Sequence, residues 1–191
     1  SVLTLTIVNL DVFSRFQLIS SERRAGLQHA ATLALDHMSK YIGRAIGDYN
    51  NPAIVDYTDR GFRVLLDCGV DSGGIPRLTI AGNGARDADD IWVAYIHENS
   101  ELRFYPNAGT GSSPGGSYEV ITKQLLATNF IIPSAERGFG YQIPFDGTDN
   151  LVENNVEVWV RLFYRPAQPA SAENPELRMR ASIQMPSVSV N

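Results

Sequence analysis

The sequence lacks three features that would each indicate a class of protein. Its single cysteine, Cys68, excludes an intramolecular disulfide and a thiolate-rich metal site. Its 16 Lys and Arg residues against 21 Asp and Glu give a net charge of −5, which argues against a nucleic-acid partner. No apolar run reaches the roughly 18 residues of a membrane span. Of its 191 residues, 43% are hydrophobic, which is enough to bury the core of one domain.

Proline is absent from the first 51 residues, and this stretch predicts one long helix. Apolar residues recur at helical spacing, Gly47 is a plausible C-cap, and Pro52 marks the stop. A helix over 2–46 would be roughly 68 Å long, so its N-terminal half is expected to project beyond the domain. The residues expected to pack against the sheet share one stripe: Leu27, Ala31, Leu35, Met38 and Ile42.

The first segment of this predicted helix is apolar around most of its circumference. No charge occurs before Asp11. Its apolar residues are Val2, Leu3, Leu5, Ile7, Val8, Leu10, Val12 and Phe13. Such a helix is buried on all sides or sits in lipid. We therefore interpret residues 1–22 as an assembly or membrane stem and 23–191 as a globular head that includes the second half of the helix.

After Pro52 the signals change to strands and turns. Residues 91–97 and 101–105 predict a hairpin joined by residues 98–100. Apolar and polar residues alternate at the start of 156–165 and along 176–185, which predicts a closing antiparallel pair. The expected fold is α+β, with the long helix packed on one face of an antiparallel sheet. A glycine-rich loop over 106–117 and a proline-rich loop over 166–175 would carry partner contacts on the head.

The sequence carries no catalytic signature, so we assign no catalytic residue and expect no enzyme. The histidines (His29, His37 and His97) are predicted to be solvated or capping residues. Two acidic loops space carboxylates as calcium loops do, and their candidate ligands are Asp87, Asp89, Asp90, Asp146 and Asp149. Neither loop fits the twelve-residue helix–loop–helix pattern, so solvated turns are the favoured interpretation. We therefore expect no cofactor and no metal, with calcium at these two loops as the less favoured alternative.

The order of these segments resembles the type IV pilin-like proteins, and most closely their minor members, the J class of type II secretion pseudopilins and the W class of type IV pilus proteins. The helix carries the resemblance, with an apolar stem, an Arg-rich turn and a Leu/Ala/Met stripe ending in Arg44-Ala45. The later segments that agree in order are 92–95, 101–105, 125–130, 156–160 and 177–183. The family's peptidase site, with its glycine, aromatic residue and glutamate, is not in this chain.

This resemblance implies a structural subunit, minor rather than major, of a pilus-like or pseudopilus filament that assembles through its N-terminal helix. A leader and part of the stem, about ten apolar residues, would precede Ser1 if the stem crosses a bilayer. The implied partners are other pilin or pseudopilin subunits and no nucleic acid. The implied location is the bacterial inner membrane with the head in the periplasm, and then a filament. Two alternatives are a major subunit and a membrane-anchored extracytoplasmic ligand-binding domain.

Overall fold

The computed structural model describes residues 2–47, 52–57, 60–111, 114–125, 139–142 and 155–185, with side chains described from residue 14 onward except at position 16. Within those residues the chain forms one helix and ten strands. They are α1 (Val2–Ile42), β1 (Ile54–Tyr57), β2 (Gly61–Leu66), β3 (Cys68–Val70), β4 (Pro76–Ala81), β5 (Ile91–Glu98), β6 (Glu101–Tyr105), β7 (Glu119–Thr122), β8 (Phe139–Gln142), β9 (Asn155–Phe163) and β10 (Glu176–Gln184).

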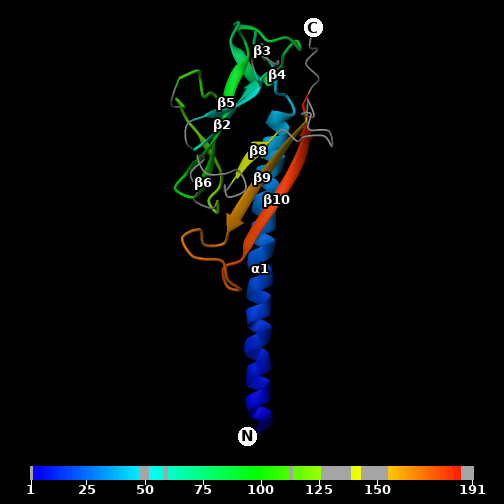
Figure 1. The fold of residues 1–191 in the computed structure, drawn as a ribbon, viewed down its shortest axis with the longest axis vertical. Helices are drawn as coiled ribbons and strands as arrows, with labels where there is room; N and C mark the ends of the chain where they lie inside the picture. Colours follow the sequence, from blue (N-terminus) through cyan, green and yellow to red (C-terminus); the bar gives the residue numbers. More distant parts are fainter. Residues whose placement is uncertain are drawn as a thin grey trace.

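Helix α1 runs past the head, with its second half against the strands and its first half projecting from them (Figure 1). The prediction that it continues to Ile46 is wrong, because it ends at Ile42. The N–H groups of Arg44 and Ala45 donate three residues back, at 2.9 Å each, which tightens the last turn. Ala45 then forms a bridge to Leu66 of β2. The apolar pattern continues past the helix because Ala45 and Ile46 are buried in this extended segment.

The strands form three antiparallel sheets. A five-stranded sheet has the order β1-β2-β5-β6-β7, a three-stranded sheet has the order β10-β9-β8, and β3 pairs with β4 alone. Strands β9 and β10 lie along the second half of α1 (Figure 1). The five-stranded sheet also contacts this half of the helix, because Tyr95 of β5 and Phe104 of β6 reach His37. The described part of the chain is therefore mostly sheet, with one helix.

The expectation of a helix packed on a single sheet is wrong, and the fold is a β-rich one. The two larger sheets contact each other directly, because the ring of Phe62 in β2 lies 5.8 Å from Phe139 and 5.0 Å from Tyr141, both in β8. One helical stripe covers too little apolar surface for all these strands. The sheets therefore bury their remaining apolar faces against one another, as packed layers do.

Several strands appear where the sequence predicts them. The β9–β10 pairing is confirmed, with an unbroken register from Glu176 opposite Phe163 to Gln184 opposite Asn155. The β5–β6 hairpin is also confirmed, and its turn consists of Asn99 and Ser100, both with positive φ. Strands β1 and β3 were not predicted, since four and three residues are too short to show a period.

One main core joins the helix to both larger sheets. The five helix residues expected to face the sheet, Leu27, Ala31, Leu35, Met38 and Ile42, are all at most 5% exposed and belong to this core. A second, smaller cluster consists of Tyr57, Ala94, Ile96, Tyr105 and Ala108, with Trp92 packed against it. Most of its members are on β5 or at the ends of β1 and β6, and Ala108 brings the loop after β6 onto it.

Candidate functional site

The projecting half of α1 is the most unusual feature of the molecule. Burial in the head begins at Leu27, although the helix begins at Val2. Among the projecting residues whose side chains are described, Leu18 is 62% and Ile19 is 42% exposed. The residues predicted as the assembly stem (Val2, Leu3, Leu5, Ile7, Val8, Leu10, Val12 and Phe13) lie in this helix, and their side chains are outside the described part of the structure.

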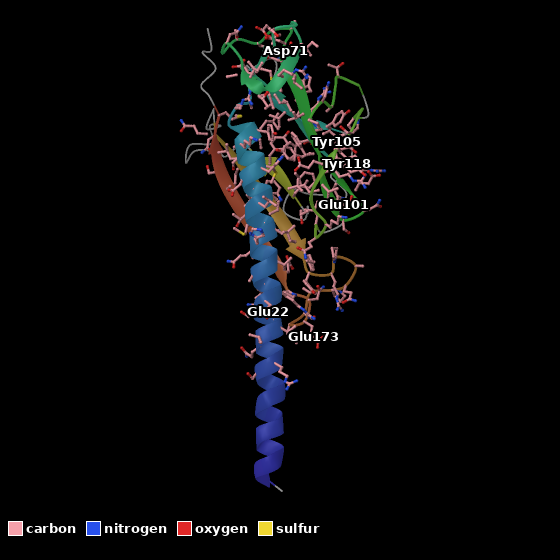
Figure 2. All side chains as sticks on the ribbon, turned by 180° about the vertical axis from the view of Figure 1, so that it is seen from behind. Glu22, Asp71, Glu101, Tyr105, Tyr118 and Glu173 are labelled. Carbon is pink, nitrogen blue, oxygen red and sulfur yellow. The ribbon has the colours of Figure 1, made fainter. Side chains whose placement is uncertain are left out.

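A loop from the head holds the helix just above its projecting part. The loop joins β9 to β10 and spans 164–175, and we call it the collar. The Ser20 hydroxyl donates to the carbonyl of Ala172 at 3.2 Å, and the Arg23 guanidinium donates to the carbonyl of Glu173. The same guanidinium lies 4.7 Å above the Tyr164 ring. Figure 2 shows Glu173 beside α1 close to the level of Glu22. These contacts join the collar to the helix at Ser20 and Arg23, on the N-terminal side of its buried stripe.

Asn174 gives the collar its shape. The residue is 3% exposed, and three carbonyl oxygens of the loop lie 2.9 to 3.1 Å from its amide nitrogen, which shares its two N–H donors among them. Its side-chain oxygen accepts the N–H of Arg165 at 2.6 Å. A buried amide that uses both its donors and its acceptor orders the backbone around it. Sequence reasoning identified the proline-rich loop but not this residue, because an asparagine in a loop carries no pattern of its own.

At the other end of α1, Arg44 ties the helix terminus to the β3–β4 hairpin. Its guanidinium donates to the carbonyl oxygens of Asp67 at 3.0 Å and Ile80 at 3.2 Å, and also to that of Leu78. Hydrogen bonds from a charged donor are stronger than those between neutral groups. The packed half of the helix is thus attached to the head at both of its ends, by the collar and by Arg44.

His37 lies between these attachments in an aromatic environment. The Tyr95 hydroxyl lies 3.1 Å from its Nδ1 and donates to its carbonyl oxygen at 3.2 Å. The rings of Tyr41 and Phe104 lie 4.9 and 4.6 Å from the imidazole. Burial lowers the pKa of His37 below its ordinary value, against the opposing effect of Glu119. The prediction of a solvated or capping histidine is wrong for His37. Its hydrogen-bond partner, Tyr95, is 58 residues away in the sequence.

Three of the predicted calcium ligands come together. Ligand oxygens of Asp87, Asp89 and Asp90 lie within 4.8 Å of one another. The Asp90 carboxylate already accepts the N–H of Asp87 at 3.0 Å, and burial raises the pKa of this carboxyl. These oxygens are of the type that calcium prefers, and they also serve as turn acceptors. Asp146 and Asp149 lie outside the described residues, so calcium binding stays an untested alternative to solvated turns.

Neither Cys68 nor the remaining histidines add a reactive group to these features. Cys68 is 1% exposed, and burial raises the pKa of its thiol, which disfavours the nucleophilic thiolate. His29 is exposed on α1, 8 positions before His37. His97 is in β5, where its backbone N–H donates to the carbonyl of Arg60 at 2.9 Å. The structure does not bring the three histidines together within the described residues.

Comparison of this chain with protein families, with curated proteins and with solved structures found no match. A search of the described residues for a helix both long enough and apolar enough to cross a membrane also found none. The resemblance to pilin-like proteins is therefore carried by the residues alone.

Proposed function

We propose that this chain is a structural subunit, minor rather than major, of a type IV pilus-like or type II secretion pseudopilus filament. The observation that carries the proposal is the projecting half of α1, which extends from the head with Leu18 and Ile19 exposed. The apolar sequence of residues 2–13 continues this segment. The order of segments that resembles the family supports the same function.

The physical argument is that an apolar helix does not stay in water. Each large apolar side chain gains roughly 1.5–3 kcal/mol when it is fully buried. Burial of the eight apolar residues of the segment over 2–13, together with Leu18 and Ile19, would therefore strongly favour association. Left exposed, they would form a larger apolar surface than a soluble monomer usually carries. Bundled helices with heads outside would satisfy them. Each head carries one helix in a fixed direction. Copies related by a screw rotation would therefore form an open-ended filament and not a closed ring.

The proposal names partners and a location. The partners are other pilin or pseudopilin subunits whose helices lie beside this one. Before assembly the subunit would be held at the bacterial inner membrane with its head in the periplasm, and after assembly it would lie in a periplasmic or extracellular filament. The collar would keep the head at one angle to the bundle, which a regular filament requires.

Site-specific crosslinking tests the proposal. Leu18→Cys places a thiol on the projecting helix, and Val70→Cys places one at an exposed apolar position on the head; the native thiol of Cys68 is buried. We expect a bifunctional maleimide to couple the Leu18→Cys copies and to leave the Val70→Cys copies uncoupled. Electron microscopy of the full chain should show particles of open-ended length, and a chain that begins at Ser20 should be monomeric by light scattering.

Three results would contradict the proposal. The first is equal crosslinking of the two cysteine variants. The second is a full chain that stays monomeric in plain buffer, and the third is a closed dimer at all concentrations. A full chain that binds lipid vesicles as single copies would favour the alternative of a membrane-anchored ligand-binding domain.

A further inference from the structure

A cavity of about 480 Å³ opens in the loop that joins β6 to β7, away from the collar. This volume is within the range of small-molecule sites, which is about 300–1,000 Å³. The residues that line it come from both arms of the loop: Pro106, Asn107, Ala108, Gly109, Gly111, Gly115, Gly116 and Ser117. None of these lining residues carries a charge.

The wall of the cavity is mostly open backbone. A Cβ atom added at Gly109, Gly115 or Gly116 would meet no heavy atom within 4 Å. Gly109 and Gly116 have positive φ, which side-chain-bearing residues rarely adopt. A ligand can therefore approach the main chain closely at these glycines. The side chains of Asn107 and Ser117 add further donors and acceptors.

One arm of the loop is fixed to the sheet. The backbone N–H of Ala108 donates to the carbonyl of Trp92 at 2.7 Å, and Ala108 is buried in the second apolar cluster. Trp92 in turn lies beside the Arg63 guanidinium, 4.5 Å from the ring centroid. Ala108 thus anchors this arm of the cavity wall to a packed layer.

An exposed aromatic ring follows the other arm. Tyr118 comes directly after Ser117 and is 46% exposed, and its ring lies 5.5 Å from that of Tyr105. The Arg103 guanidinium lies 4.3 Å from the centroid of the Tyr118 ring. Its charge is paired with Glu101 at 2.9 Å and with Glu98. Figure 2 shows Tyr105, Tyr118 and Glu101 in succession on one flank of the head.

We propose that this cavity and the Tyr118 ring bind a neutral saccharide chain. An anionic ligand would need a free cation, and a metal ion would need carboxylates, but the lining residues offer neither. A wholly apolar ligand would offer no hydrogen-bond partner to the polar side chains of Asn107 and Ser117 in the lining. A sugar has hydroxyl groups that both donate and accept, and an apolar ring face that packs on an exposed tyrosine. The proposal is independent of filament assembly.

Calorimetric titration of the full chain, in buffer free of sugar-based detergent, tests this inference. The probes are maltotetraose, cellotetraose and chitotetraose, with tetragalacturonate as a charged counterpart. We expect one or more of the neutral probes to bind, and tetragalacturonate to bind more weakly than that probe. Tyr118→Ala should weaken binding about tenfold, which corresponds to about 1.4 kcal/mol.

Two further variants separate binding from folding. Gly115→Leu should abolish binding by filling the cavity, at a position with open space and no positive φ. Tyr164→Ala removes a comparably exposed tyrosine, 37% exposed, from the collar and should leave saccharide binding unchanged. The inference is overturned if no neutral probe binds, if tetragalacturonate binds more tightly, or if Gly115→Leu retains binding. Equal weakening by Tyr164→Ala and Tyr118→Ala would also overturn it.

Discussion

The two halves of α1 are continuous in backbone but opposite in environment. Residues 27–42 place a stripe of fully buried side chains in the main core, whereas described residues 14–26 have none that is buried. One half is therefore helical because tertiary packing holds it, and the other can rely only on local propensity, the collar and whatever covers it. The difference teaches that one continuous helix can be a structural element of the head along one half and an exposed surface along the other.

The largest effect should come from the packed half. Leu35 is buried, whereas Leu33 is exposed two residues earlier on the same helix. We expect Leu35→Ala to lower the free energy of unfolding by about 2–5 kcal/mol, because it leaves a cavity in the core. Leu33→Ala is the matched control and should change it by less than about 0.5 kcal/mol. Chemical denaturation measures both, and equal effects would show that the stripe is not the helix–sheet contact.

The next effect should come from the attachment at the end of α1. Arg44→Met keeps the aliphatic part of the side chain and removes its donors to three carbonyls of Asp67, Leu78 and Ile80. We expect a loss of about 1.5–3 kcal/mol in the free energy of unfolding, the range for hydrogen bonds to a charged group. Lys40→Met, on the exposed side of the helix, should cost much less. If Arg44→Met leaves the free energy of unfolding unchanged, the hairpin is held by other contacts.

Sequence patterns predicted pairings between neighbouring strands but not the assignment of strands to sheets. The β9–β10 pair follows from alternation along both strands, and the β5–β6 hairpin from two strands close in sequence. In contrast, β7 pairs with β6 in one sheet and the next described strand, β8, pairs with β9 in another. This choice depends on long-range packing, such as the contact of Phe62 with Phe139, which no local period encodes.

The candidate sites show the same limit. The apolar helix was visible in the sequence because it needs only composition and the absence of proline. The place of His37 was not, because Tyr95 and Phe104 reach it from strands far along the chain. Asn174 was missed for a similar reason, since its four hydrogen bonds depend on how the collar folds.

A smaller effect should appear as pH dependence of the packed half. Burial lowers the pKa of His37 from its ordinary 6.5, so the unfolded chain binds the proton more tightly than the folded one. The stability contributed by neutral His37 is complete above pH 6.5 and declines as the pH falls towards the folded-state pKa. Denaturation at pH 7 and pH 5 measures this loss.

Two variants assign the pH dependence to a residue. His37→Gln should have a smaller loss of stability between pH 7 and pH 5 than the parent chain, although it is less stable at pH 7 because the aromatic contacts are lost. His29→Gln changes an exposed histidine of the same helix and should keep the parent's pH dependence. An unchanged pH dependence in His37→Gln would assign the effect to other groups.

The smallest effect on global stability, and the most direct test of the boundary between the two halves, should come from the collar. Arg23→Ala removes the hydrogen bond to the Glu173 carbonyl and the stacking on Tyr164, where a cation–π contact at an exposed site contributes about 0.5–1 kcal/mol. Arg24→Ala is the matched control, since Arg24 is the neighbouring exposed arginine. We expect Arg23→Ala to reduce global stability by no more than this range. Hydrogen exchange of the amides over 14–26 should become faster while that over 27–42 does not change, because the core still holds the second half. If exchange rises equally in both halves, or rises equally in Arg24→Ala, the collar does not set the boundary, and the direction of the projecting helix must be fixed by the core alone.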